Sequence, residues 1–547
     1  MEKTTTFPLR YTAYAVSVAG LVISLPVSLW LGTGYLFPLV FGALAAIGTR
    51  DLLQRKHTVS RNYPIMANFR YLFESIGPEI RQYFIQSDTE ERPFSREQRT
   101  IVYQRAKNVL DKRPFGSQLG MYDEGFEWMN HSMTPTRLSS SDFRILIGRN
   151  CDKPYSASVF NISAMSFGSL SANAILSLNT GAKKGGFYHD TGEGSISRYH
   201  REPGGDLVWE IGSGYFGCRH PDGSFNPEMF ERNATLEQVK MIEVKLSQGA
   251  KPGHGGILPG AKVTPEIAEA RGVRVGEDCV SPASHSAFST PIELLEFLDQ
   301  LRRLSGGKPV GFKLAIGHPW EWFAIVKAML KTGKKPDFIV VDGGEGGTGA
   351  APLEFINRLG IPMTEALLLV HNTLVATNLR EDIAIGAAGK ITSAFNIART
   401  LALGADWCNS ARGYMFSLGC IQALNCHTGR CPSGVATQDP RRGNKLDVPP
   451  KSERVYNFHK NTLDALQNLL QAAGLHHPSE LGPEHIVRRV SKTEVHSYMD
   501  LFPFLEPGAL LKGKTGLGVF DKYWESAQPE TFEPPEFVLA LRETKLR

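Results

Sequence analysis

Eight short β-rich segments follow one another after residue 150, and helical patterns lie between several of them. The predicted strands cover residues 158–164, 187–190, 207–211, 241–246, 310–316, 338–341, 383–385 and 406–409, and the clearest predicted helices cover residues 291–303, 321–331, 364–378 and 393–403. Strands that alternate with helices indicate parallel βαβ units, and eight such units in roughly 250 residues fit a closed barrel. An open doubly wound sheet would want a G-x-G-x-x-G motif after an early strand, and none stands there. The sequence therefore predicts an α/β fold, a (β/α)8 TIM barrel.

Glycine-rich or polar segments follow four of the predicted strands. They are Met165-Ser-Phe-Gly-Ser-Leu-Ser, Thr191-Gly-Glu-Gly, Gln248-Gly-Ala-Lys-Pro-Gly-His-Gly-Gly and Asp342-Gly-Gly-Glu-Gly-Gly-Thr-Gly. In such barrels the chemistry lies at the carboxyl ends of the strands, and glycine lets the backbone approach a ligand closely. One glycine-rich loop is usually only a turn. Four of them at matching strand ends predict a ligand site there.

The N-terminal segment carries no charged residue from Tyr11 to Thr49. Because about 20 apolar residues cross a bilayer as a helix, residues 11–31 predict one span, residues 32–34 a turn, and residues 35–49 a second, tight span. Basic residues flank the pair on both sides, which favours both ends, and so the catalytic part, on the cytoplasmic side of the cell (inner) membrane. A cleaved signal peptide or a buried core hairpin are the alternatives. The uncharged run is too long for a signal peptide, and the basic cluster after it would resist export.

The domain organisation follows from these features. We predict a transmembrane helical hairpin at residues 1–50, a helical and irregular extension at 51–149, the barrel at 150–445 and a C-terminal extension at 446–547. Within the first extension, Ser95 begins a pattern typical of a capped helix. The net charge is +5, from 60 basic and 55 acidic residues, and no concentrated basic face stands out, so no nucleic-acid partner is expected.

Three of the seven cysteines lie close together in the sequence. An odd, sparse set in a long chain is not a disulfide framework. Cys420, Cys426 and Cys431 form C-x5-C-x4-C, followed by Pro432. Three thiolates in a loop can ligate an iron–sulfur cluster, whereas zinc would want a fourth ligand, for which His427 is a candidate. The spacing alone leaves both open.

The cysteine segment also carries a family resemblance. Gly419-Cys-Ile-Gln-Ala-Leu-Asn-Cys-His-Thr-Gly-Arg-Cys-Pro-Ser-Gly-Val-Ala-Thr-Gln-Asp-Pro resembles the 3Fe-4S segment of glutamate synthase. Further matches are Ser163-Ala-Met-Ser-Phe-Gly, Gln248-Gly-Ala-Lys-Pro-Gly, Leu258-Pro-Gly-Ala-Lys-Val and Gly346-Gly-Thr-Gly-Ala-Ala-Pro, in the family's order. The resemblance implies an FMN-containing barrel, an oxidoreductase acting on CH–NH2 donors. It reduces 2-iminoglutarate, made from 2-oxoglutarate and ammonia, to glutamate.

The resemblance also implies four kinds of site residue. The cluster ligands would be Cys420, Cys426 and Cys431. The flavin contacts would be Ala164, Met165, Ser166 and Lys313, where a cation by the polar edge stabilises the reduced, anionic flavin. The phosphate contacts would be Gly389, Lys390, Ala411 and Arg412. The 2-oxoglutarate contacts would be Lys251 and Arg271, with Glu193 for proton handling at the imine.

Departures from the family's pattern leave the substrate open. Ile257 stands where the family has a glutamine that contacts 2-oxoglutarate, and Lys390 replaces the second glycine of a phosphate loop. A related keto or imino acid, or an amine in place of ammonia, is therefore an alternative. Because the first cysteine is Cys151, no glutaminase segment is expected, and the nitrogen would come from free ammonia, from an amine, or from a separate partner that supplies ammonia. Electrons would come from a protein such as a ferredoxin, or from the membrane.

A second hypothesis belongs to a different class of protein. The chain would be a membrane-bound flavin and iron–sulfur electron-transfer or sensory module that has lost amino-acid chemistry. Ile257 and His254 motivate this reading, because both depart from the family's pattern. The presence of Lys251, Arg271 and Glu193 at the matching positions argues against it.

Overall fold

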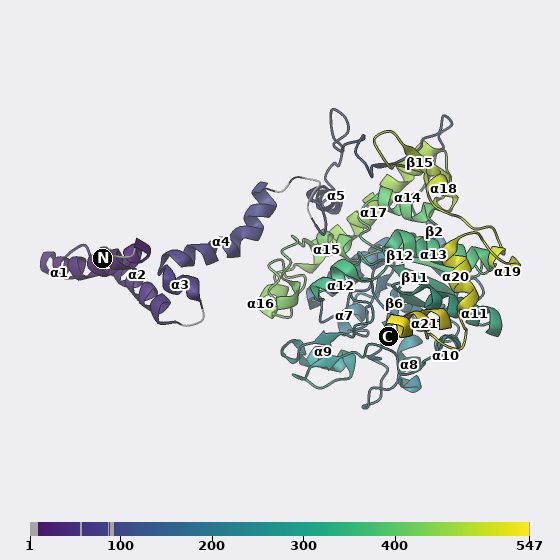
Figure 1. Cartoon of the computed structure of the whole chain (residues 1–547), viewed down its shortest axis with the longest axis horizontal. Helices are drawn as coiled ribbons and strands as arrows, with labels where there is room; N and C mark the ends of the chain where they lie inside the picture. Colours follow the sequence, from purple (N-terminus) through teal and green to yellow (C-terminus); the bar gives the residue numbers. More distant parts are fainter. Residues whose placement is uncertain (1–8, 55–56, 86, 88–91, 546–547) are drawn as a thin grey trace. The chain divides into compact units, whose positions relative to one another are not determined.

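The computed structural model describes residues 9–54, 57–85, 87 and 92–545, which form two compact units divided between residues 91 and 92 (Figure 1). This division falls inside the segment predicted at 51–149. The first unit contains the short helix η1 (Leu9–Tyr11), the helices α1 (Thr12–Leu31), α2 (Leu36–Leu53), α3 (Thr58–Asn62) and α4 (Met66–Ile80), and the short π-helix η2 (Arg81–Ile85).

The first two helices form the predicted hairpin. They pack against each other, and α1 ends at Gly32 in the left-handed conformation, where glycine carries no steric penalty. A side chain at Gly20 would meet the ring of Phe41, so this glycine lets the two helices approach closely. Residues Leu9–Leu31 and Leu36–Leu53 are long and apolar enough to cross a membrane.

The second unit is built on a closed barrel of eight parallel strands (Figure 1). These are β4 (Phe160–Ile162), β5 (His189–Asp190), β6 (Leu207–Ile211), β7 (Val239–Lys245), β10 (Val310–Leu314), β11 (Phe338–Asp342), β12 (Ala384–Ala388) and β13 (Trp407–Ser410). Each strand pairs with the next in this order, and β13 closes on β4 with Cys408 opposite Phe160. The predicted (β/α)8 barrel is confirmed, with every strand where the sequence indicated one.

Helices follow each barrel strand. They are α6 (Ala172–Gly185), α7 (Arg198–Arg201), α8 (Pro227–Ala234), α10 (Pro291–Leu304), α11 (Pro319–Thr332), α12 (Leu353–Arg358), α13 (Met363–Ala376), α14 (Ala394–Ala402) and α15 (Arg412–Leu418). Their starts follow local rules. Helix α10 begins with Thr290 and Glu293 in a reciprocal capping box around Pro291, and its apolar face is buried against the barrel.

An excursion after β7 contains β8 (Ile257–Leu258), η3 (Gly260–Lys262), α9 (Pro265–Arg271) and β9 (Cys279–Val280), with β8 and β9 paired as antiparallel strands. At the opposite end of the barrel, the hairpin of β2 (Arg144–Ile147) and β3 (Tyr155–Ser158) packs on Tyr188, Val208, Phe338 and Trp407. These residues lie early in their strands or just before them. The hairpin therefore closes the amino-terminal end of the barrel and leaves the carboxyl ends for a site.

The segments before and after the barrel, which were predicted as separate extensions, pack against each other and against the barrel helices. Helix α5 (Arg96–Ala106) begins with Ser95 and Gln98 in a capping box, which confirms the predicted capped helix. Strand β1 (Glu127–Met129) pairs with β14 (Ile486–Arg489), which pairs with β15 (Val495–Ser497). The long helix α17 (Val448–Ala473) packs on α5, α6 and α15. The remaining elements are η4 (Cys426–Thr428), α16 (Pro440–Gly443), η5 (Pro478–Glu480), η6 (Pro483–His485), α18 (Tyr498–Leu501), α19 (Ala509–Lys512), α20 (Gly518–Ser526) and α21 (Glu536–Lys545).

Candidate active site

A cavity of about 1240 Å3 lies at the carboxyl ends of the barrel strands. The four glycine-rich or polar strand ends singled out in the sequence all contribute to its wall. So do most of the expected site residues, namely Ala164, Met165, Ser166, Glu193, Lys251, Arg271, Lys313, Gly389, Lys390, Ala411, Arg412 and Cys426. Cys420 and Cys431 line a small neighbouring cavity together with Arg412 and Cys426. The fold thus gathers all the expected residues around two adjoining spaces; the role of each stays a prediction.

Two of the glycines at these strand ends serve contacts between loops. Gly192 has φ 62°, and a side chain there would lie 2.8 Å from the backbone nitrogen of Ser166. A side chain at Gly249 would lie 1.7 Å from the carbonyl oxygen of Gly343. Such contacts exclude any Cβ atom. The glycines therefore shape the cavity wall first of all, by letting neighbouring loops meet backbone to backbone.

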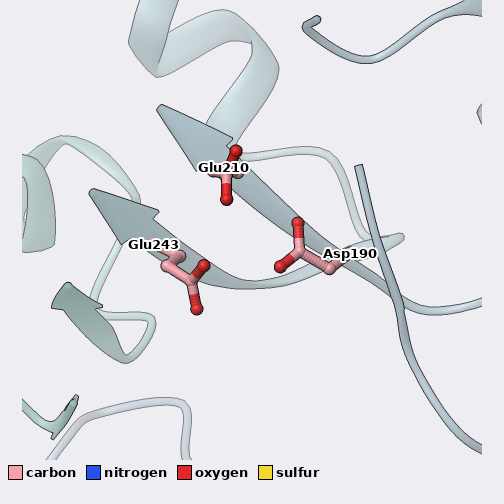
Figure 2. Close-up of side chains that lie close together, drawn as sticks. All are labelled: Asp190, Glu210 and Glu243. Atoms are coloured by element: carbon pink, nitrogen blue, oxygen red, sulfur yellow. The ribbon is translucent and has the colours of Figure 1, made fainter. Parts of the chain in front are cut away.

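Three buried carboxylates and one lysine occupy the barrel interior beneath the cavity. Asp190, Glu210 and Glu243 extend from β5, β6 and β7 toward one another, as Figure 2 shows, with their oxygens within 4.8 Å. Lys313 on β10 forms ion pairs with Glu210 and, at 3.2 Å, with Glu243. The side chains of both pairs are at most 6% exposed. The ammonium group of Lys313 is thus already the positively charged partner of this carboxylate cluster.

Sequence reasoning found Lys313 and missed its three partners. The signal was present, because Glu210 interrupts an otherwise apolar strand and Glu243 stands between apolar residues in the middle of its strand. In a barrel whose strands are covered by helices outside, a charged residue in such a run must lie inside, where it needs a partner. Lys313 was the matching partner. It lies on β10, the strand next to the β7 strand of Glu243, and is paired in register with Lys245 on β7.

The charges in this cluster are set by burial and by one another. Burial raises the pKa of Asp190 well above its usual range, and the neighbouring Glu243 and Glu210 raise it further. Burial likewise raises the pKa of Glu243 to about 7, although Lys313 opposes the shift. Burial would lower the pKa of Lys313, but Glu210 and Glu243 hold it well above the usual value. Lys313 is therefore charged at neutral pH, and Asp190 holds its proton more tightly than a free aspartate does.

This arrangement predicts a pH-dependent contribution to stability. Because the pKa of Glu243 is raised from 4.5 to about 7 by folding, the folded chain holds a proton that the unfolded chain has lost in this window. The contribution is fully present below pH 4.5 and is lost as the pH rises through 7, by on the order of 3 kcal/mol. We expect Glu243→Gln to remove this loss.

The measurement compares the apparent melting temperature of the wild type and of Glu243→Gln between pH 5 and 8. Buried histidines such as His200, whose pKa burial lowers to about 3, act in the opposite direction as they ionise on unfolding. These histidines are present in both proteins, so the difference in melting temperature between the two proteins reports on Glu243 alone. A constant difference over this range would contradict the prediction.

A second charged group lies at the rim of the cavity, above the cluster. Glu193 accepts a hydrogen bond from Lys245 at 2.6 Å. Burial alone would raise the pKa of Glu193, but Lys245, with Lys251 and Arg271 beside it, lowers that pKa to about 2. Glu193 is therefore ionised at neutral pH and has no proton to give. Lys251 is the better donor, because burial lowers the pKa of its ammonium group from the usual value, although Glu193 partly opposes this.

Arg271 is a buried cation that forms no ion pair among the described residues. Its guanidinium contacts the Cys279 sulfur at 3.6 Å, donates to the carbonyl of Phe167 at 3.3 Å and lies 5.2 Å from the ring of Phe216. Its Nε atom is buried without a partner in the described part of the chain. A buried charge that is neither paired nor fully hydrogen-bonded is costly. An anionic ligand in the cavity would remove that cost.

The cavity as a whole has an excess of positive charge. Four acidic side chains line it, namely Glu193, Glu210, Asp342 and Glu345. Nine basic side chains line it, namely Arg92, Lys245, Lys251, Lys262, Arg271, Lys313, Arg358, Lys390 and Arg412. Such a charge balance attracts anions. The arrangement is suited to an anionic cofactor and an acidic substrate.

The three loop cysteines follow helix α15. Cys420 and Cys431 are buried and Cys426 is half-buried. The segment is held from the N-terminal side of the barrel unit: Tyr103 donates a hydrogen bond of 2.6 Å to the carbonyl of Cys420. Burial would raise the pKa of the Cys431 thiol, but the Ser433 hydroxyl and nearby backbone N–H groups lower it below its usual value.

The spacing of these thiols bears on the choice of metal. Among the described residues, the one group of three or more His, Cys, Asp or Glu ligand atoms within 4.8 Å of one another is the carboxylate cluster of Figure 2. At least one pair of the three sulfurs therefore lies more than 4.8 Å apart, whereas sulfurs around a single tetrahedral ion at 2.3 Å keep roughly 3.8 Å. His427, the candidate fourth ligand of zinc, lines the large cavity instead.

Comparisons with known proteins agree on one family. A family model described as the conserved region in glutamate synthase matches residues 137–476. The glutamate synthase large subunit-like protein YerD of Bacillus subtilis (strain 168) is 40% identical over 486 residues, which are 81% of this chain and 92% of that protein. The archaeal glutamate synthase (NADPH) of Methanocaldococcus jannaschii is 33% identical over 353 residues, 64% of this chain and 65% of that protein. The chain thus spans just under two thirds of the archaeal relative.

Solved structures with a similar chain path include flavin enzymes. The recombinant flavin-binding domain of baker's yeast flavocytochrome b2 has a TM-score of 0.40 and 10% identity, covering 71% of this chain and 78% of that one. A mandelate oxidase mutant with a monooxide FMN adduct has a TM-score of 0.39 and 12% identity, covering 79% of this chain and 99% of that one. The barrel of the present chain is defined by its own strand pairing.

Proposed function

The chain belongs to the glutamate synthase family, and from this we propose that it is a membrane-anchored oxidoreductase that reduces 2-iminoglutarate with FMN and a 3Fe-4S cluster. The imine would form from 2-oxoglutarate and ammonia or an amine. One observation carries the proposal: a single cavity is lined by Lys313, by the unpaired cation Arg271 and by Cys426 of the thiol loop. Cofactor, substrate and cluster would thus meet in one space.

The residues of the cavity fit FMN. Loops after β12 and β13, the seventh and eighth barrel strands, are where barrels of this kind bind phosphate. Gly389 and Lys390 follow β12, and Arg412 follows β13 with its Nη1 atom buried and without a partner in the described part of the chain. A phosphate group would satisfy this atom. Lys313 would face the polar edge of the ring system, held in place by its buried carboxylates.

The thiol loop fits an iron–sulfur cluster better than a single ion. Cluster ligands bind different iron atoms and need not converge on one point, and the three described sulfurs do not all lie within 4.8 Å of one another. Arg412 and Cys426 line both cavities, so the cluster would adjoin the flavin site. When bound, the cluster would pass electrons to FMN, and FMN would supply hydride to the imine carbon.

The rim of the cavity would bind and protonate the substrate. Arg271 would hold a carboxylate, which satisfies its buried guanidinium. Lys251 would deliver the proton to the imine, while the ionised Glu193 keeps Lys245 and Lys251 in position. Ile257 is 63% exposed at the mouth of the cavity, and it leaves an apolar surface where the family has an amide. That surface would accept the alkyl group of an amine, which favours N-alkylglutamate as a second candidate product.

The hairpin of the first unit would anchor the protein in the cell membrane. Helix α1 has 20 residues, about 30 Å of helix, which matches the hydrocarbon core of a bilayer. Apolar side chains on both helices, among them Ile23, Trp30 and Phe37, are more than half exposed. The basic residues on both flanks of the hairpin would place the barrel on the cytoplasmic side. A ferredoxin-like protein or a membrane partner would supply electrons.

Anaerobic spectroscopy tests the proposed reaction. We expect the protein purified in detergent to show a flavin spectrum and the EPR signal of an oxidised three-iron cluster. After reduction, the flavin should reoxidise only when 2-oxoglutarate and ammonium are both added, with glutamate as the product. Reoxidation with methylammonium but not ammonium would indicate N-methylglutamate. Reoxidation with neither would favour an electron-transfer or sensory module, and an iron-free protein would contradict the cluster.

A further inference from the structure

Helix α4 in the first unit has one continuous apolar face. Its apolar residues recur at steps of three and four, which places them on one side of the helix, and they are Met66, Phe69, Leu72, Phe73, Ile76 and Ile80. Its polar residues occupy the other side, and they are Asn68, Arg70, Glu74, Ser75 and Glu79. This pattern differs from α1 and α2, which are apolar all round and suit a membrane span.

Within the first unit, the described residues leave the apolar face of α4 uncovered. Met66, Phe69, Leu72 and Phe73 are each more than half exposed, and Ile76 is 38% exposed. A soluble monomer rarely leaves a contiguous row of large apolar side chains in water. We therefore expect another surface to cover this apolar face, and the position of the helix indicates which surface that is.

The start of α4 is held at the end of the predicted second span. The buried carboxylate of Asp51, in the last turn of α2, accepts hydrogen bonds from the backbone N–H of Ile65 at 3.0 Å and from the amide of Asn68 at 2.6 Å. Ile65 is itself buried and lies against Gly48, where the uncharged run of α2 ends. The first turn of α4 is thus fixed at the level where α2 would leave the hydrocarbon core.

We propose that α4 is an interfacial helix that lies in the lipid headgroup region with its apolar face in the bilayer. Helices with an apolar face and a charged face bind in this way, with the apolar face buried some 5–10 Å into the boundary of the acyl chains. The polar face of α4 carries Arg70, Glu74 and Glu79, so insertion of apolar and aromatic side chains, rather than attraction to anionic lipid, supplies the binding energy. The inference rests on the proposed membrane anchor.

Photocrosslinking in the full-length protein tests this placement. The protein is reconstituted in lipid vesicles, and p-benzoylphenylalanine replaces one residue at a time. Phe73 lies on the apolar face, and Tyr71 is a matched aromatic residue on the other side of the same helix. We expect lipid adducts at Phe73 at least about fivefold more often than at Tyr71, and similar adduct yields at Phe69 and Ile80, since a helix that lies in the interface keeps a constant depth.

Ile23, in the middle of α1, separates this inference from the proposed anchor. Lipid adducts at Ile23 without lipid adducts at Phe73 would overturn the interfacial helix and leave the anchor standing. An absence of lipid adducts at Ile23 would overturn the anchor itself. Adducts from Phe73 to the barrel unit or to a second copy of the chain would identify another occupant, and lipid adducts at Phe69 but not at Ile80 would show that α4 projects from the membrane. Each of these results would overturn the inference.

Discussion

Serine in place of Cys420, Cys426 or Cys431 is expected to abolish iron binding while the FMN content stays unchanged. Loss of residues that merely support metal ligands already costs 10–100-fold, so loss of a ligand should lower turnover with an external electron donor by on the order of 100-fold or more. The proposed flavin contacts lie on the barrel strands or directly after them and not in the thiol loop itself, which is why FMN should remain. Metal analysis and EPR spectra measure the iron, flavin absorbance measures the FMN content, and an assay with a reduced viologen measures turnover.

Cys151→Ser is the matched control for these variants. Cys151 is half-buried and lines neither of the two cavities. It should retain iron, flavin and turnover at the wild-type level. A Cys426→Ser variant with full iron content would contradict the assignment of that ligand, and zinc in the wild-type protein would contradict the cluster.

The barrel could be predicted from sequence because its signals are local. Most of the eight strands are short segments rich in apolar residues, followed by glycine or polar residues, and capping residues such as Thr290 mark helix starts. Strand order in a closed parallel barrel follows sequence order, so the positions of the strands were enough to predict the topology. The sheet of β1, β14 and β15 was not predicted, because Glu127 pairs with Arg488 from the far end of the chain and neither segment shows the partner.

The site was predictable only as a set of residues. The family resemblance named the residues, and the strand ends indicated a shared location, but neither showed their electrostatic partners. Lys245 on β7 forms an ion pair with Glu193, and the three carboxylates near Lys313 lie on three separate strands. Such partners depend on which strand positions face inward. Similarly, nothing in the sequence around Tyr103 indicates that it donates a hydrogen bond to Cys420.

Lys313→Met is expected to destabilise the barrel unit and to impair flavin reduction at the same time. Removing one partner of a buried ion pair leaves an uncompensated charge, which typically costs about 3–5 kcal/mol. Glu210 would be that charge, since it lies against Lys313 with its side chain 2% exposed. The variant should therefore melt well below the wild type. The bound flavin should also be harder to reduce, because no cation faces its reduced, anionic form.

A double variant separates these two effects. Lys313→Met combined with Glu210→Gln removes both charges of the pair, and replacing a whole buried pair by neutral groups is often close to neutral for stability. We expect most of the lost melting temperature to return, while the reduction potential of the flavin stays low and turnover stays reduced by about 100-fold. Recovery of both properties would show that Lys313 acts only through folding. Recovery of neither would show that Asp190 and Glu243 also depend on the Lys313 charge.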